Sequence, residues 1–322
     1  MAFTTSVPTE ADLEPFRREL TGYCYRMLGS GFEADDAVQE TMVRAWRGAS
    51  GFEGRSSLKS WLYRIATNVC LDMLRGRDRR ARPMELGPSS APEAHHLGPL
   101  LPEHAWVSPI ADPRVMPLDG DPAEIATARE SIRLAFVTAL QHLPPRQRAV
   151  LILCEVLRWQ ATEAAELLDT TVPAVNSALQ RARASLAAVD PAARPLVVEA
   201  DQRELLARYV DAFERYDVTE LVTLLAEDAV QSMPPYAMWI EGSSNIGAWL
   251  LGPGIECRGS RLVPIEANGG PGFAQYRVDP DGGWAPWSIQ VLDIADGRIT
   301  GFHSFLGAEL FEEFGLPPHL DA

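Results

Sequence analysis

The chain lacks the features that mark membrane, secreted and metal-binding proteins. None of its apolar runs is long enough to cross a bilayer. It does not begin with a basic stretch followed by an apolar one, so we expect no signal peptide. Its four cysteines are far apart and form no Cys-x-x-Cys pair, which argues against a disulfide framework or a zinc site. We therefore expect a cytoplasmic protein with no cofactor, no metal and no membrane partner.

Lysine is also nearly absent, with one residue against 28 arginines, which is typical of a GC-rich genome. The net charge of −15 would by itself argue against a nucleic-acid partner, but the charge is distributed unevenly. Residues 1–82 and 129–188 each carry +2, whereas residues 83–128 carry −6 and residues 189–322 carry −13. Within the first block, residues 55–82 carry +6. Two segments are therefore suited to nucleic acid although the whole chain is acidic.

The residue pattern predicts a multidomain protein of four segments. Residues 1–82 and 123–190 have helical periodicity, and residues 83–122 form an acidic linker rich in Pro and Gly. Residues 199–322 begin with helices and end in strands, which predicts an α+β domain. The expected strands are 261–267, 272–278, 287–294 and 298–305. Asp296-Gly297 predicts a tight hairpin between the last two.

Residues 159–183 read as two short helices joined by a tight turn. Glu163–Leu168 would be the positioning helix, Asp169–Thr171 the turn, and Val172–Leu186 a reading helix that enters the DNA major groove. Thr171 can cap the reading helix. The residues expected to face outward are Pro173, Ala174, Asn176, Ser177, Gln180 and Arg181. Asn, Gln and Arg side chains can read base edges, although a surface helical hairpin of another α domain would have the same pattern.

Two further helices are predicted in the first segment. The helix Asp35–Trp46 has an apolar stripe that we expect to be buried, formed by Val38, Met42, Ala45 and Trp46. Ser57 can cap the second helix. Around that cap, aromatic and cationic residues interleave: Phe52, Trp61 and Tyr63 with Arg55, Lys59 and Arg64. This mixture suits unpaired bases, which stack on rings while phosphates meet charge, but aromatics at helical spacing can equally be core residues.

These stretches together resemble the extracytoplasmic-function (ECF) bacterial sigma factors. Residues 33–46 look like their region 2.2, residues 52–70 like regions 2.3 and 2.4, and residues 143–148 with the helix-turn-helix like region 4. The three pieces occur in the family's order over about residues 10 to 188. The resemblance implies two all-α domains, region 2 and region 4, and a function in promoter recognition and transcription initiation.

The resemblance also implies partners and site residues. Core RNA polymerase would bind through its β′ clamp helices and β flap, and region 2.2 would supply Asp35, Asp36, Gln39 and Glu40 to the clamp helices. Region 2 would melt and read the −10 element with Arg55, Ser56, Ser57, Leu58, Lys59, Trp61, Arg64 and Asn68. Region 4 would read the −35 element with the outward residues named above, and the linker would thread the channel from which RNA leaves. The resemblance leaves open whether an anti-sigma factor is a further partner.

The reading helix departs from the family pattern at two positions. Asn176 and Ala178 stand where the family usually has cations, so we expect weak phosphate anchoring by the free protein. Asp169 replaces the usual turn Gly or Asn, and Asp tolerates the left-handed conformation.

The last segment resembles the SnoaL-like proteins, which have the cone-shaped α+β fold of nuclear transport factor 2. The similarity lies in residues 224–230, 233–235 and 239–242, followed by curved strands. The fold implies a ligand pocket, for which we expect Tyr209, Trp239, Trp249, Gln275, Trp287 and His303. Asp293 and His303 are the pair that could do acid–base work, but no second acid converges on them by sequence, so we expect no catalytic residues and a regulatory domain.

Two other functions were weighed against the sigma-factor hypothesis. A SnoaL-like cyclase, hydrolase or ligand-binding protein with an N-terminal DNA-binding module would need convergent polar groups in its pocket. A dimeric repressor would need a basic reading helix and a self-complementary face, and it would leave residues 33–70 unexplained. The sigma factor with a built-in regulatory domain accounts for all four segments, so we favour it.

Overall fold

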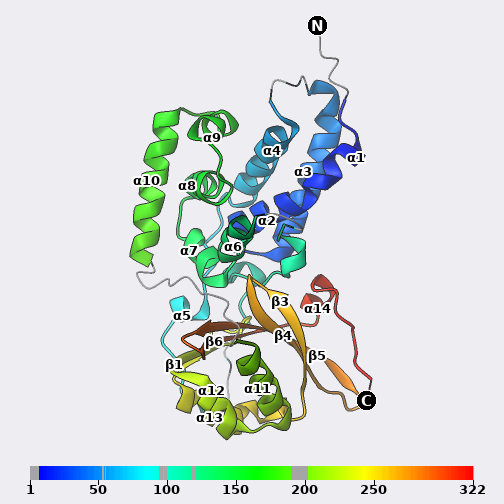
Figure 1. Cartoon of the computed structure of the whole chain (residues 1–322), viewed down its shortest axis with the longest axis vertical. Coiled ribbons are helices and arrows are strands. Elements are labelled where there is room, and N and C mark those ends of the chain that lie inside the picture. The colour runs from blue at the N-terminus through cyan, green and yellow to red at the C-terminus, as the bar shows by residue number, and fades with distance from the viewer. Residues whose placement is uncertain are drawn as a thin grey trace. The chain divides into compact units, whose positions relative to one another are not determined.

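The chain folds into two compact units, each built from two separate stretches of sequence. One unit comprises Met1–Arg80 and Pro113–Ala193, and the other comprises Ala81–Asp112 and Arg194–Ala322. The computed structural model describes residues 7–52, 54, 56–93, 97, 100–117, 121–189 and 202–321. The first unit is helical and the second contains a sheet with helices (Figure 1). The predicted order of helical segments followed by an α+β segment is confirmed.

Residues 7–80 form the first helical body. Its elements are α1 (Glu10–Leu13), η1 (Glu14–Phe16), α2 (Arg17–Leu28), α3 (Gly31–Gly48), η2 (Ala49–Gly51) and α4 (Leu58–Met73). Nine consecutive residues of α2, from Leu20 to Leu28, are buried, so this helix is the centre of the body. Ser30 and Ser57 cap α3 and α4 by accepting hydrogen bonds from the amides of Glu33 and Ser60. The predicted Ser57 cap is confirmed.

Residues 121–189 form the second helical body. Its elements are α6 (Pro122–Glu130), α7 (Leu134–Gln141), α8 (Pro145–Leu151), the π-helical turn η5 (Ile152–Val156), α9 (Ala161–Leu167) and α10 (Val172–Val189). The first and second helical bodies pack together, with α2 against α7 and α8, and α4 against α8 and α9. Gly29 ends α2 with a positive φ of 75°, and a Cβ there would approach the amide of Gln141 to 3.2 Å. A residue without a side chain is therefore needed where the two bodies meet.

The C-terminal domain, residues 202–321, is a six-stranded sheet in the order β2-β1-β6-β5-β4-β3. Its strands are β1 (Leu225–Ser232), β2 (Trp239–Glu241), β3 (Arg261–Ala267), β4 (Gly270–Val278), β5 (Trp284–Ala295) and β6 (Arg298–Leu306). All neighbouring pairs are antiparallel except β1 with β6. The helices are α11 (Gln202–Arg215), α12 (Val218–Leu224), α13 (Ser243–Leu251), η6 (Pro253–Cys257) and α14 (Glu309–Glu313). Figure 1 shows α11, α12 and α13 together on one side of the sheet, where they share a buried apolar core with it.

Four of the six strands agree with the sequence prediction to within three residues at each end. Asp296 and Gly297 have φ values of 51° and 70°, the conformation that a two-residue hairpin turn requires. Strands β1 and β2 were not predicted. Half of β1 is exposed or half-buried, and β2 has three residues, so neither gives a clear alternating pattern.

The linker segment, residues 81–112, lies on the C-terminal domain. It contains α5 (Pro83–Leu86), η3 (Glu103–Ala105) and η4 (Asp112–Arg114), whose last two residues belong to the helical unit. The indole N–H of Trp239 donates to the carbonyl of Gly87, and the Trp239 carbonyl accepts from the amide of Ser90. Near the other end, Asn268 exchanges two hydrogen bonds with the backbone of Ile110, at 3.0 and 3.1 Å. The segment predicted as the linker thus divides at residue 112, and its first part belongs to the second compact unit.

Candidate nucleic-acid and polymerase interfaces

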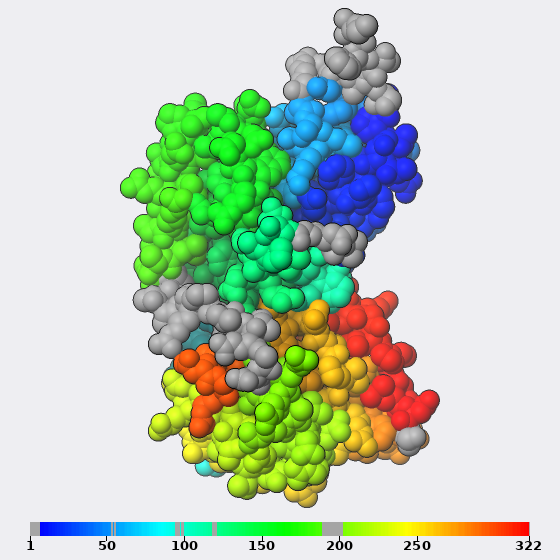
Figure 2. Space-filling view, in the orientation of Figure 1, coloured from blue at the N-terminus to red at the C-terminus, as the bar shows by residue number. Residues whose placement is uncertain are grey.

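The helix-turn-helix has the local geometry that its sequence predicts. Asp169 in the turn has a positive φ of 50°, and the Thr171 hydroxyl accepts a hydrogen bond of 3.3 Å from the amide of Ala174. Val175 and Ala182 are fully buried, which fixes the face that α10 turns inward. All six residues expected on the outer face are exposed: Pro173, Ala174, Asn176, Ser177, Gln180 and Arg181. Figure 2 shows α10 on the surface of the helical unit, in green at the left of the view.

The residues predicted to meet the −10 element surround the start of α4. Ser57, Arg64 and Asn68 are exposed, whereas Ser56, Leu58, Lys59 and Trp61 are half-buried. Trp61 packs on Phe52 with ring centroids 5.1 Å apart, so neither ring stands free. Arg55 lies outside the described residues. The structure therefore places six of the eight residues on or near one exposed helical surface, with Ser56 just before it.

Two of the cations near α4 already have partners. The Lys59 ammonium lies 2.5 Å from a carboxylate oxygen of Glu19 on α2. The Arg64 guanidinium donates a hydrogen bond of 2.8 Å to the backbone carbonyl of Glu166 on α9. Both interactions occupy donors that a phosphate would otherwise accept from.

The residues predicted to meet polymerase line one side of α3. Asp36, Gln39 and Glu40 are exposed and Asp35 is half-buried. Glu40 forms an ion pair of 2.7 Å with Arg44 one turn later, and Asp35 forms one with Arg114, which follows the linker segment. This side of the helix is acidic and open to solvent, as a docking surface requires.

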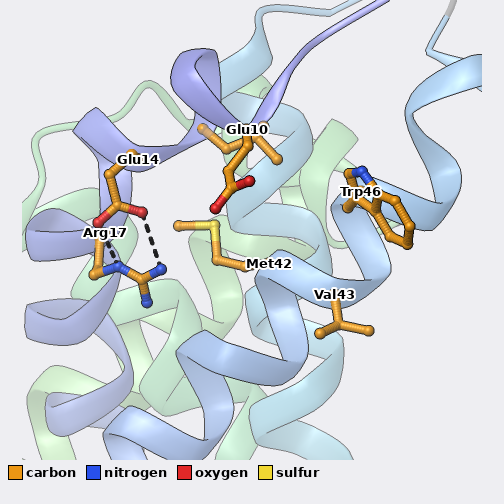
Figure 3. Close-up of a pocket in the computed structure, with 7 residues that line it drawn as sticks. Glu10, Glu14, Arg17, Met42, Val43 and Trp46 are labelled. Atoms are coloured by element: carbon orange, nitrogen blue, oxygen red, sulfur yellow. Dashed lines mark hydrogen bonds and ion pairs between the residues drawn. The ribbon is translucent and has the colours of Figure 1, made fainter.

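A pocket of about 230 Å³ lies beside this surface and was missed by the sequence analysis (Figure 3). Its apolar lining is Leu13, Met42, Val43 and Trp46, and Glu10, Glu14 and Arg17 are its polar residues. Trp46 is 67% exposed, so the prediction that it belongs to the buried stripe is wrong. Trp46 follows the fully buried Ala45 and lies about 100° further round the helix, so it stands at the edge of the buried stripe and its indole is exposed. The sequence held no signal for the pocket, because the exposure of Trp46 appears only in the structure.

The six residues predicted to line a ligand pocket are only partly brought together: Tyr209, Trp249 and Gln275 lie on one face of the sheet, and the other three do not join them. Tyr209 on α11 donates a hydrogen bond of 2.9 Å to Gln290, whose amide group donates to Gln275 on β4. This buried polar chain lies on the helix-covered face of the sheet, and burial raises the pKa of the Tyr209 hydroxyl well above its usual value. His303 lies on the opposite face, because its register partner on β5 is Val291 rather than Gln290.

Each of the three tryptophans among the predicted pocket residues makes contacts in a different part of the domain. Trp239 binds the linker segment, and Trp287 packs under the guanidinium of Arg277 at 4.1 Å from its ring centroid. Trp249 is buried in the core that the helices share with the sheet, with its indole N–H unpaired. Gln231 on β1 also belongs to that face and has an unpaired buried amide oxygen.

Asp293 and His303 are in contact, as their strand positions suggested. His303 Nε2 lies 3.0 Å from Asp293 Oδ2, and His303 Nδ1 lies 2.8 Å from the hydroxyl of Ser232 on β1. Gly301 leaves the space for the pair, since a Cβ there would come within 2.8 Å of both side chains. Both His303 and Ser232 are buried, so this chain of hydrogen bonds ties three strands together.

Within the described part of the chain, no group of acidic, His and Cys residues could hold a metal ion. The helices described there include none that is long and apolar enough to span a membrane.

The fold is that of a sigma factor that carries an extra α+β domain. Residues 13–80 match the Sigma-70 region 2 family, residues 133–186 match Sigma-70 region 4, and residues 206–302 match the SnoaL-like domain. The ECF RNA polymerase sigma factor SigG of Mycobacterium tuberculosis (strain ATCC 25618 / H37Rv) is 46% identical over 315 residues, which cover 96% of this chain and 84% of SigG. The chain therefore belongs to the ECF RNA polymerase sigma factors.

A second relative matches nearly the whole chain. The ECF sigma factor SigJ of the same strain is 26% identical over 324 residues, which cover 94% of this chain and 92% of SigJ. The crystal structure of M. tuberculosis SigJ covers 96% of this chain and 100% of its own with a TM-score of 0.60 at 22% identity. The predicted family, fold class and sigma-factor function are confirmed.

Proposed function

We propose that this chain binds core RNA polymerase through the exposed side of α3 and directs it to promoters through α4 and α10. The observation that carries the proposal is the outer face of α10, on which all six predicted base- and phosphate-facing residues are exposed next to a capped turn. In this assignment Asp35, Asp36, Gln39 and Glu40 meet polymerase. The −10 element meets the surface around the start of α4, and the protein acts in the cytoplasm, where its partners are.

We further propose that the pocket beside α3 extends the docking surface. An exposed tryptophan over an apolar pocket is a common anchor of protein interfaces. Arg17 and Glu14 pair at 2.7 Å and compensate each other, so Glu10 is the acidic residue of the pocket that would favour a basic partner helix.

Trp46→Ala should weaken capture of core polymerase about tenfold or more, because a buried aromatic anchor would be lost from the interface. The free energy of unfolding should change by less than about 0.5 kcal/mol, since the side chain is mostly exposed in the free protein. Capture on immobilised core polymerase and thermal unfolding measure the two effects. Leu251→Ala, which truncates another exposed apolar side chain, is the control. Equal capture by Trp46→Ala and the control would remove the pocket from the docking surface.

We propose no catalytic step for the C-terminal domain and assign it a regulatory role. The pair Asp293–His303 bonds to a buried serine and lies on the sheet face opposite the polar chain of Tyr209, which supports a structural function. The domain instead holds the linker segment through Trp239 and Asn268. A linker segment bound in this way cannot at the same time thread the polymerase channel that the family resemblance assigns to it.

In vitro transcription with core polymerase tests this function directly. The full chain should give promoter-specific initiation, and a chain that ends at residue 195 should give a different level because the linker segment is no longer held. Trp239→Ala in the full chain should shift transcription in the same direction as the truncation, since it removes the bond to Gly87. No initiation by either protein would refute the sigma-factor role, and identical levels from all three would refute the regulatory role.

A further inference from the structure

The reading helix α10 carries no carboxylate and only two cations. Its 18 residues include no Asp or Glu, and the cations are Arg181 and Arg183. In the major groove each base needs its own side-chain chemistry. A carboxylate accepts from cytosine, an arginine or lysine donates to guanine, and an amide pairs with adenine. A carboxylate contact with cytosine is therefore excluded for α10.

An ion pair withdraws Arg183 from the reading of guanine. Its guanidinium donates to a carboxylate oxygen of Glu155 in η5, outside the reading helix. Arg183 also lies about three turns beyond the start of α10, whereas base edges are met by residues near the amino end of a reading helix. In the described part of the chain, Arg181 is then the cation of α10 that has no carboxylate partner.

The polar residues on the outer face of α10 form two neighbouring lines. Asn176 and Gln180 are four residues apart and both are exposed, so their amides follow one line along the helix surface. Ser177 and Arg181 have the same spacing and are also exposed. The first line offers a donor and an acceptor at each residue. The second offers a hydroxyl and a guanidinium, which are the groups that commonly bind phosphate oxygens.

The two amides of the first line match the edge of adenine. An amide group forms two hydrogen bonds with adenine N6 and N7 in the major groove. Residues four apart on a helix are separated by about 6 Å along its axis, and successive bases of one DNA strand by about 3.4 Å. Asn176 and Gln180 can therefore meet two adenines about two base pairs apart. Neither amide is engaged in a hydrogen bond with the described residues, so both are available.

The apolar residues of the same face favour the same base pair. Pro173 and Ala174 are exposed at the amino end of α10, next to the cap formed by Thr171. Every A·T pair carries the C5-methyl group of thymine in the major groove, where alanine side chains make apolar contacts with it. The amides and the apolar residues of α10 are thus both suited to A·T pairs.

We propose that Asn176 and Gln180 determine the −35 specificity of this sigma factor, and that they select an element with two adenines about two base pairs apart. Ser177 and Arg181 bind phosphates and position the helix without selecting a base. This inference rests on the proposed role of α10 at the −35 element, and it names the bases that this surface selects.

The base preferences of the holoenzyme measure this assignment. Core polymerase with the full chain transcribes a template library whose −35 region is randomised, and each template carries a transcribed barcode. The rest of the promoter is a sequence selected by the wild type. The wild type should prefer adenine at two positions, by roughly 5- to 100-fold over the other bases. Asn176→Ala should remove the preference at one of these positions, and Gln180→Ala should remove it at the other.

Gln180→Arg tests the assignment through a change of preference. Because arginine donates two hydrogen bonds to guanine, the Gln180 position should change from adenine to guanine, and the Asn176 position should keep adenine. Arg181→Ala is the matched comparison. Loss of a phosphate contact should lower transcription from all templates by a similar factor and leave the base preferences unchanged. The three side chains are exposed, so circular dichroism and thermal unfolding should match the wild type.

Several outcomes would overturn the inference and leave the proposed promoter function intact. These are a −35 preference without adenine, a preference that neither amide variant alters, and a Gln180→Arg variant that keeps adenine at both positions. An Arg181→Ala variant that changes the preferred base at one position would also contradict it. Failure to initiate from every template would refute the proposed function itself, and the inference with it.

Discussion

Replacing Asp36 and Glu40 together with arginine should abolish capture of core RNA polymerase. Both carboxylates are exposed on α3, and in the described part of the chain Glu40 pairs with Arg44 of the same helix. Reversal of two charges at an interface places like charges against the basic partner that we propose, which costs several kcal/mol and corresponds to a loss of about 100-fold or more. Co-purification with core polymerase at fixed salt measures the effect.

The matched control reverses the same two charges on another surface. Glu227 and Asp228 are exposed neighbours on β1 of the C-terminal domain, so Glu227→Arg with Asp228→Arg gives the same change in net charge. The control should retain capture within about twofold. The α3 variant should remain folded, because exposed ion pairs contribute at most about 1 kcal/mol. Equal capture by the two double variants would place the docking surface elsewhere.

Replacing Gln180 and Arg181 with alanine should lower promoter-specific transcription about 10- to 100-fold and leave capture of core polymerase unchanged. Both side chains lie on the exposed face of α10, beside the buried Ala182 that holds the helix against its body. One good side-chain contact with a base edge is worth about 1–3 kcal/mol, and the loss of one such contact is enough for this effect. The template is a promoter selected from a randomised library by the wild-type holoenzyme.

The chain contains a second Gln-Arg pair that serves as the control. Gln202 and Arg203 open α11 in the C-terminal domain, and their double alanine variant should transcribe at the wild-type level. A template with a scrambled −35 element should lower transcription by the wild type. The difference in transcription level between the wild type and the α10 variant should then become smaller. If the α10 variant transcribes normally from the selected promoter, its outward residues do not read DNA.

Local signals in the sequence predicted the helix-turn-helix because each of them acts within a few residues. The Thr171 cap, the left-handed Asp169 and the seven-residue spacing of the buried Val175 and Ala182 all depend on near neighbours. The hairpin at Asp296-Gly297 was predictable for the same reason. The roles assigned to the site residues remain predictions, but their exposure on α10 follows from this local pattern.

Long-range contacts were not predictable from the same signals. Trp46 stands at the edge of a helical stripe, and only the packing of other elements against α3 decides whether the ring is buried. The face on which His303 lies depends on strand register, which shifts where β6 has one extra residue opposite Asp293 and Ile294. The buried Arg26 on α2 donates a hydrogen bond to the hydroxyl of Ser131, which is 105 positions away, and nothing in the sequence around either residue marks them as partners. A composition rich in Pro and Gly likewise gives no sign that residues 81–112 lie on the C-terminal domain.

The path of the chain through the two compact units limits how far apart the first and second helical bodies can lie on a promoter. The polypeptide between the first and second helical bodies includes residues 81–112, which belong to the other unit. Fully extended, those 32 residues could span about 110 Å, but while they stay bound to the sheet domain most of that length is unavailable. The spacing between promoter elements that this sigma factor tolerates would therefore depend on how much of the tether its own C-terminal domain retains.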